Sequence, residues 1–150
     1  MDAINYLLSI ETKGIKLGLE RTRNMVEACG NPHLGVPVIQ VAGTNGKGSV
    51  CAMLASILKA ANYKTGLFTS PHLIKVNERV RINGRAISNN EINTFIQVYK
   101  SNIETIGATF FETITALAFW YFYKEKVDIA IFETGLGGRL DSVTICNPKC

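Results

Sequence analysis

The sequence has 150 residues, of which 47% are hydrophobic and 19% are charged. A chain of this length can bury one ordinary hydrophobic core, and nothing in the composition indicates disorder, so we expect a single domain. The formal net charge is +4, but the basic residues are scattered along the chain. This distribution argues against a basic arm for nucleic acid or for a membrane surface, and we expect neither as a partner.

The apolar runs and the cysteines also exclude several classes of protein. The most apolar run, residues 114–123, is shorter than the roughly 20 residues of a membrane helix. Met1 leads into an acidic, amphipathic segment, so we expect no secretory signal. The four cysteines include no CxxC pair, which argues against a zinc site and favours reduced thiols. These features together predict a cytoplasmic protein.

The strongest motif lies in residues 36–61. An apolar run over residues 36–42 precedes a glycine-rich segment and then a helical pattern, which predicts a strand, a phosphate loop and a helix. The glycines let backbone N–H groups turn toward one point, and the positive end of the helix faces the same point. Lys47 can reach the terminal phosphates of a nucleotide, and the Ser49 hydroxyl stands where a P-loop holds Mg²⁺. The predicted loop consists of Gly43, Thr44, Asn45, Gly46, Lys47, Gly48 and Ser49.

The loop departs from the usual Walker A spacing, because Val41 stands where that pattern has its first glycine. The alternative is a glycine-rich turn that binds nothing. Such a turn rarely needs three glycines, a lysine and a hydroxyl together, so we favour nucleotide binding. The helix after the loop carries an apolar stripe that we expect to lie in the core. The stripe consists of Val50, Met53, Leu54, Ile57 and Leu58.

The remaining elements alternate between helices and strands. Asp2 is a plausible N-cap of a first helix, and Ser88 with Glu91 predicts a capping box for a later one. Residues 82–85 carry the strongest hairpin signal, Ile-Asn-Gly-Arg. Further helices are expected over residues 19–29 and after residue 109, and strands over residues 64–68 and 127–132. This order predicts an α/β fold with a P-loop-type, mostly parallel sheet flanked by helices.

Two side chains follow predicted parallel strands, where ligands bind in open α/β sheets. Glu133 ends the strand at 127–132, and burying its carboxylate would be costly without a cation, so we predict a metal ligand. Ser70 follows the strand at 64–68 and could complete the metal shell; from the residues alone, a serine capping a turn before Pro71 is the preferred interpretation. Arg79 and Arg81 could attract a carboxylate substrate, although a solvated strand face is the commoner explanation.

Six motifs in the same order resemble folylpolyglutamate synthase and dihydrofolate synthase, within the Mur ligase superfamily. The motifs are residues 43–49 together with Gly18-Leu19-Glu20-Arg21, Ser70-Pro71-His72-Leu73, Glu78-Arg79-Val80-Arg81, Phe111-Glu112, and residues 133–141, Glu-Thr-Gly-Leu-Gly-Gly-Arg-Leu-Asp. These motifs are spread along nearly the whole chain, from Gly18 to Asp141. The resemblance implies a fold like the Mur ligase central domain, with ATP and Mg²⁺ as cofactors.

The resemblance also implies roles for particular residues. Lys47 is the expected catalytic residue, and Ser49, Ser70 and Glu133 are the expected metal ligands. The expected contacts to folate or dihydropteroate are Ile15, Leu17, Thr109, Phe111, Glu112, Leu140, Asp141 and Ser142. From the residues alone, core packing explains Phe111 equally simply, and Ile15 and Leu17 could belong to a helix linker.

The implied activity is ATP-dependent addition of L-glutamate to a folate or dihydropteroate carboxylate through an acyl phosphate. Members of this family are far longer, so residues 1–150 are expected to be an incomplete N-terminal ATP-binding domain without the glutamate-binding C-terminal domain. We expect this chain alone to be inactive and the full-length form to be a monomer. Two alternatives stay open: another P-loop NTPase or kinase, and a non-catalytic module that binds nucleotide or pteridine.

Overall fold

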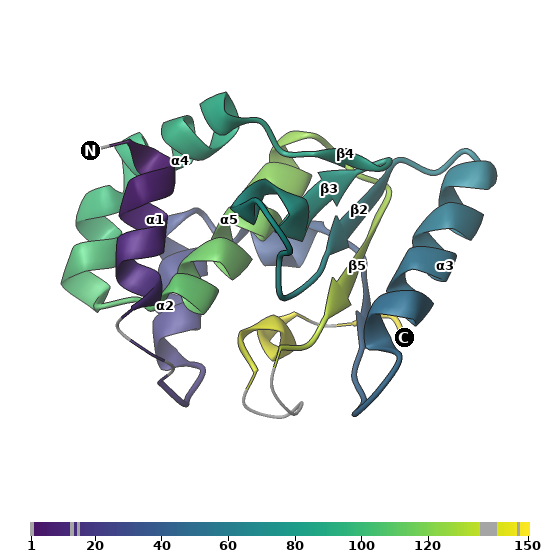
Figure 1. The fold of residues 1–150 in the computed structure, drawn as a ribbon, viewed down its shortest axis with the longest axis horizontal. Coiled ribbons are helices and arrows are strands. Elements are labelled where there is room, and N and C mark those ends of the chain that lie inside the picture. Colours follow the sequence, from purple (N-terminus) through teal and green to yellow (C-terminus); the bar gives the residue numbers. More distant parts are fainter. Residues whose placement is uncertain (1, 13, 15, 136–140, 147) are drawn as a thin grey trace.

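One mixed β-sheet forms the centre of the computed structural model, which describes residues 2–12, 14, 16–135, 141–146 and 148–150 (Figure 1). Within these residues the sheet has five strands in the order β1-β5-β2-β3-β4. The strands are β1 (Val38–Val41), β2 (Thr65–Phe68), β3 (Val80–Ile82), β4 (Arg85–Ala86) and β5 (Ile129–Glu133). β5 pairs in parallel with β1 and β2, whereas β2–β3 and β3–β4 are antiparallel. The predicted α/β class is therefore confirmed, with an antiparallel extension at one edge.

Helices cover both faces of the sheet (Figure 1). The helix that follows the glycine-rich loop, α3 (Lys47–Ala60), lies on one face and contacts β1, β2 and β5. The other side holds α1 (Ala3–Glu11), α2 (Glu20–Ala28), α4 (Asn89–Ile106) and α5 (Phe110–Lys124). Short 3₁₀ turns occupy Pro32–Gly35, Val76–Arg79 and Ser142–Ile145. None of the helices in the described part of the chain combines the length and apolar character needed to cross a bilayer.

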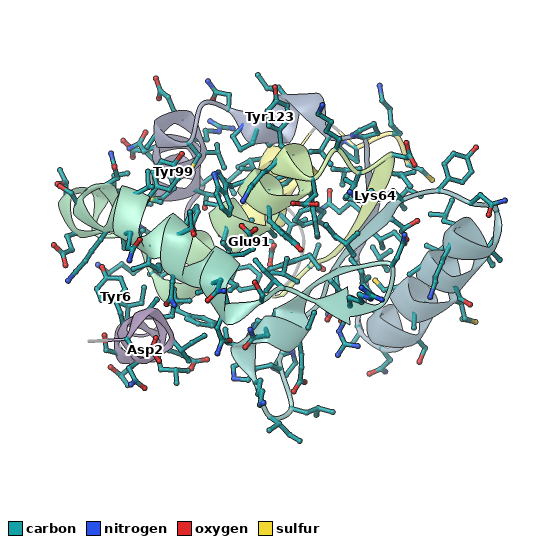
Figure 2. All side chains as sticks on the ribbon, turned by 90° about the horizontal axis from the view of Figure 1, so that it is seen from above. Asp2, Tyr6, Lys64, Glu91, Tyr99 and Tyr123 are labelled. Carbon is teal, nitrogen blue, oxygen red and sulfur yellow. The ribbon has the colours of Figure 1, made fainter. Side chains whose placement is uncertain are left out.

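Local signals in the sequence set several of these boundaries. The Asp2 side chain accepts a hydrogen bond from the Ile4 N–H, and Ser88 accepts one from the Glu91 N–H, as their predicted capping roles require. The carboxylate of Glu91, which Figure 2 labels, does not close a capping box. Its Oε2 instead lies 2.6 Å from Lys124 Nζ of α5. The predicted hairpin is confirmed: Asn83 and Gly84 both have positive φ, as a type I′ turn between β3 and β4 requires.

The two apolar helices differ in how deeply they are buried. Residues 112–119 of α5 are all buried, because this helix packs on β2 and also on α1, α2 and α4. In α3, Cys51 is buried and Leu54 and Leu58 are half-buried, so this face meets the sheet. Val50, Met53 and Ile57 lie about a quarter-turn away and are 41%, 57% and 64% exposed. The prediction that the whole apolar stripe lies in the core is therefore wrong for these three residues.

Three parallel strands end at the same edge of the sheet. Val41 at the end of β1 is paired with Glu133 at the end of β5, and Phe68 at the end of β2 is paired with Phe132. The segments that follow these strands therefore begin side by side. They are the glycine-rich loop, the segment from Thr69, and the segment from Thr134, which together carry most of the predicted site residues.

Candidate nucleotide and substrate site

The glycine-rich loop has the backbone geometry of an anion-binding turn. Gly43 and Gly46 have φ values of 155° and 77°, and Gly46 is the N-cap of α3. Because Gly46 has no side chain, it cannot cap the first turn of α3, and the amide groups there are left to water or to a ligand. The Lys47 stem lies along the loop, because a Cβ added at Gly43 would be 3.8 Å from Lys47 Cγ. Thr44, Asn45 and Ser49 are exposed on the same surface.

Glu133 lies between the glycine-rich loop and the end of β2. Glu133 is only 6% exposed. Oε2 accepts a hydrogen bond of 3.2 Å from the Ser70 N–H, and Oε1 would lie 4.0 Å from a Cβ added at Gly48. Burial, together with the nearby negative charge of Glu133, raises the pKa of the Cys51 thiol to about 12, while Lys47 acts in the opposite direction. The structure thus brings Lys47, Glu133 and Ser70 to one place.

This donor set can be tested against the predicted Mg²⁺ site. In the part of the chain that the structure describes, no three His, Cys, Asp or Glu side chains cluster around a common point. Mg²⁺ bound to a nucleotide does not need such a cluster, because phosphate oxygens and waters fill most of its coordination shell and one or two protein oxygens suffice. A buried carboxylate on Glu133 beside Ser70, with Ser49 on the facing helix turn, fits a metal held in that way.

A cavity of ≈ 450 Å³ opens beside Ser70. Its walls come from the end of α1 and the following segment, the start of α5, the segment after β2, and the segment after β5. Among the predicted substrate contacts, the structure places six on these walls: Leu17, Thr109, Phe111, Glu112, Asp141 and Ser142. Ile15 and Leu140 lie outside the described residues. Segments from nearly the whole length of the chain, from Glu11 to Ser142, therefore meet around one space.

Glu112 holds the cavity wall together. Both carboxylate oxygens accept hydrogen bonds of 3.0 Å from Arg21 Nε, and Oε2 also accepts one of 2.8 Å from the Thr109 N–H. Arg21 Nη2 in turn donates to the carbonyls of Lys16 and Leu17. This network ties the segment before α2 to the first turn of α5. The structure therefore shows Glu112 as a positioning residue of the wall.

Asp141 and Ser142 are fixed by buried hydrogen bonds. Asp141 Oδ1 accepts from the Val143 N–H at 3.0 Å, and Oδ2 accepts from the Gly135 N–H at 2.7 Å. The Thr22 hydroxyl donates to Ser142 Oγ at 3.0 Å. These bonds orient the Asp141 carboxylate at the cavity wall.

Phe111 packs against the segment after β5. A Cβ added at Gly135 would lie 2.8 Å from Phe111 Cζ and 3.2 Å from Asp141 Oδ2, so a glycine is required at this close approach. The Phe111 ring also lies 5.9 Å from the Phe68 ring at the end of β2. Phe111 thus combines the two interpretations made from the sequence, because it packs against the core cluster and also lines the cavity.

Several cavity residues were not predicted from the sequence as substrate contacts: Glu11, Gly14, Lys16, Pro71, Phe110 and Gly135. Arg79 was considered only as one of two arginines on a strand face. The structure instead separates the pair. Arg79 ends the 3₁₀ turn, is 6% exposed and lines the cavity, whereas Arg81 lies in β3 and its Nε donates to the Glu78 carbonyl. The Glu-Arg-Val-Arg motif was the only feature of the sequence that could have indicated a role for Arg79 in the cavity.

Comparison with known proteins gives a consistent result. No family model matches the chain. A probable bifunctional folylpolyglutamate synthase/dihydropteroate synthase of Haloferax volcanii is 41% identical over 98% of this chain, and the dihydrofolate synthase/folylpolyglutamate synthase of Bacillus subtilis is 43% identical over 90% of it. The chain spans only 18% and 33% of the length of these two relatives.

Solved structures show the same similarity. The folylpolyglutamate synthase of Thermotoga maritima superposes with a TM-score of 0.90 at 39% identity, over 97% of this chain and 36% of that one. The E. coli FolC structure in complex with DHPP and ADP gives 0.89 at 38% identity, over 99% of this chain and 36% of that one. Over nearly its whole length, the chain is therefore homologous to the N-terminal part of the folylpolyglutamate and dihydrofolate synthases and has the fold of that part.

Proposed function

We propose that residues 1–150 form the ATP-binding part of a ligase that adds L-glutamate to the carboxylate of a folate or of dihydropteroate. The observation that carries this proposal is the contact between the two halves of the site. Ser70 lines the cavity, and its N–H donates to Glu133, whose other oxygen faces Gly48 of the glycine-rich loop. A carboxylate at this end of the cavity would therefore meet the terminal phosphate of a nucleotide on the loop.

The similar proteins support this assignment. The E. coli structure holds DHPP and ADP together, and the curated relatives are folylpolyglutamate and dihydrofolate synthases. Because this chain spans only about a third of the B. subtilis relative, the activity and substrates of the whole protein are extended to it as a proposal. The proposed small-molecule substrates are ATP, L-glutamate and a folate or dihydropteroate.

The proposed nucleotide site uses the loop backbone and one lysine. The open amides at the start of α3 would hold the phosphates, with Lys47 reaching the terminal one. Glu133, Ser49 and Ser70 would hold Mg²⁺. The metal, when bound, would neutralise charge on the transferring phosphoryl group. The chain's own contribution is to place the nucleotide and the substrate carboxylate in line, which is the main source of rate in phosphoryl transfer.

The proposed reaction has two steps. A carboxylate oxygen of the substrate attacks the γ-phosphorus of ATP, so that the bond to ADP breaks and an acyl phosphate forms. The amine of L-glutamate then attacks the acyl carbon, and inorganic phosphate leaves as the amide bond forms and a proton is released. Lys47 is the proposed catalytic residue, because its ammonium group stabilises charge on the transferring phosphoryl group.

The proposed substrate contacts lie around the cavity. Asp141, held by two backbone N–H groups, would accept hydrogen bonds from the aminopyrimidine edge of a pterin. Phe111 would flank the ring, with Leu17 covering it from the segment before α2. Thr109, Glu112 and Ser142 would shape the wall rather than contact the reacting atoms.

Calorimetric titration of this chain with Mg-ATP tests the nucleotide site. We expect binding that is weakened at least tenfold by Lys47→Ala and by Glu133→Ala, because each removes a charge-assisted contact. Lys59→Ala is the matched control, since Lys59 lies in the last turn of the same helix, away from the loop, and its loss should change nothing. Equal binding by all four proteins would contradict the proposed nucleotide site.

A further inference from the structure

Arg79 is a buried cation in the cavity wall. It is only 6% exposed, and its carbonyl accepts a hydrogen bond of 3.0 Å from the Thr69 N–H. This bond fixes the residue beside Ser70, at the end of β2 where the cavity approaches Glu133. An arginine in such a position keeps its charge, so burying it is costly unless an anion lies close by.

The contacts of the Arg79 guanidinium supply little negative charge. Nε donates to His72 Nδ1 at 2.8 Å, a contact that supplies a hydrogen-bond acceptor but no carboxylate charge. The guanidinium carbon lies 4.9 Å from the centre of the Phe110 ring. Nη2 is 3.6 Å from Glu11 Oε1, and the Glu11 side chain is 42% exposed, so this ion pair is long and hydrated. Burial lowers the pKa of Arg79, and Glu11 only partly offsets this effect.

Arg21, which is bonded to the cavity-lining Glu112, provides a comparison in which the charge of a guanidinium is fully paired. Its Nε and Nη2 lie 2.9–3.0 Å from the oxygens of the buried Glu112, in a two-pronged arrangement. Arg79 is buried more deeply than Arg21, with side-chain exposures of 7% and 24%, yet its only contact with a carboxylate among the described residues is the long one to Glu11. A carboxylate from a ligand in the cavity would give Arg79 the compensation that Glu112 gives Arg21.

The first turn of α5 separates Arg79 from Asp141. Phe110 lies under the Arg79 guanidinium, whereas Phe111 packs at Gly135, whose N–H is bonded to Asp141. Neighbouring residues of a helix point about 100° apart, so the two aromatic rings face different parts of the cavity. The cavity therefore presents a hydrogen-bond acceptor beside one ring and a cation beside the other. This lining suits a flat ligand with ring N–H donors at one end and a carboxylate at the other.

We propose that Arg79 binds the carboxylate of the substrate and so makes the cavity select anionic over neutral ligands. The proposal rests on the function proposed above for the same site, and it adds a specificity-determining residue to it. Glu11 competes with the ligand for the guanidinium, because its carboxylate occupies the one ion pair described for Arg79.

The test compares two ligands that differ only in charge, pteroate and its carboxamide, by calorimetric titration of this chain. We expect wild-type protein to bind pteroate about 10- to 100-fold more tightly than the amide, as one charge-assisted contact in a partly buried site predicts. Arg79→Gln should abolish this preference while leaving amide binding within a few fold. Arg81→Gln, which removes the same charge two residues away and outside the cavity, should keep the preference.

Glu11→Gln provides a second variant that does not remove a buried group. Because Glu11 lies in the last turn of α1 and is exposed, this change should leave the fold intact and should tighten pteroate binding severalfold, with little effect on the amide. Equal binding of the two ligands by wild-type protein would overturn the role of Arg79 and leave the cavity as a pterin site. Binding of neither ligand would overturn both the cavity assignment and this inference, whatever the result with Mg-ATP.

Discussion

The two halves of the site are built in different ways. The glycine-rich loop is exposed and presents backbone amides from the start of α3, with few side-chain contacts to the rest of the molecule. The cavity wall is a set of buried side chains that hydrogen-bond to one another across long sequence separations, such as Arg21 with Glu112 and Thr22 with Ser142. Changes in the loop should therefore alter binding more than stability, whereas changes in the wall should alter both.

Glu112→Ala should have the largest effect on stability and tests the wall directly. Removing this carboxylate leaves the Arg21 guanidinium without its carboxylate partner and removes the half of the α5 capping box that accepts from the Thr109 N–H. We expect a loss of about 3–5 kcal/mol in the free energy of unfolding, as found for broken buried ion pairs. Urea denaturation followed by circular dichroism measures it.

A surface pair provides the control for Glu112→Ala. Lys100 and Glu104 lie 4.0 Å apart on α4, and both side chains are more than half exposed. Glu104 also interacts with the Tyr6 hydroxyl, so Glu104→Ala should cost about 1 kcal/mol or less, still well below the loss for Glu112→Ala. If the two variants lost similar stability, the contrast between wall and surface would fail.

Gly135→Ala should have the next largest effect. The backbone at this position does not require a glycine, but the new methyl group would lie 2.8 Å from Phe111 Cζ and must displace the ring or the Asp141 carboxylate. Overpacking of this kind costs about 1–3 kcal/mol. The same change should weaken pteroate binding, because both displaced groups line the cavity. Thermal denaturation and calorimetric titration of the same sample measure the two effects together.

Gly46→Ala is the counterpart in the loop. A Cβ there meets nothing within 4 Å, but φ is +77°, a conformation that costs an alanine about 1–2 kcal/mol. Since alanine also restricts the unfolded chain, the net loss of stability should be about 1 kcal/mol or less. Mg-ATP binding should fall while pteroate binding stays unchanged. A loss of pteroate binding equal to that of Gly135→Ala would show that loop and wall are not separable.

Glu78→Gln should give the smallest effect, and it appears in the pH dependence. Hydrogen bonds from the N–H groups of Leu73 and Lys75 hold the pKa of Glu78 below its ordinary value of 4.5 in the folded protein. The ionised form therefore stabilises the fold above pH 4.5, and this stabilisation is lost as the pH falls through the lowered pKa. The melting temperature of wild-type protein should exceed that of the variant at pH 7, and the difference should shrink below pH 4.5. A difference that grows in acid would reverse the assigned sign.

Much of the fold follows from local sequence signals. Asp2, Ser88 and the Asn83-Gly84 turn act through their immediate neighbours, so their positions could be predicted without knowledge of the packing. The depth to which each helix is buried could not be predicted in this way. An apolar stripe shows which residues tolerate burial, but whether Met53 or Ile57 is covered depends on what lies on the far side of α3.

The site shows the same division. Glu133 could be placed at the edge of the sheet, because a residue that ends a parallel strand has a known location. Arg79 could not, because its burial depends on contacts with Glu11, His72 and Phe110, which come from three separate segments. Glu112 was predicted to contact the substrate through the family resemblance, and its bond to Arg21 could not be anticipated from either motif alone.

The convergence of three strand ends at one edge has a consequence for how such proteins diversify. The glycine-rich loop follows β1, whereas two of the cavity walls follow β2 and β5, so in the function proposed above the phosphate-binding loop and most of the acceptor pocket come from separate stretches of the sequence, which meet at Ser70 and Glu133. Loops anchored on a rigid sheet tolerate substitution and insertion. With the proposed function, selection can therefore alter the acceptor pocket in small steps while the phosphate-binding loop is inherited unchanged, which favours families that share one mechanism across many substrates.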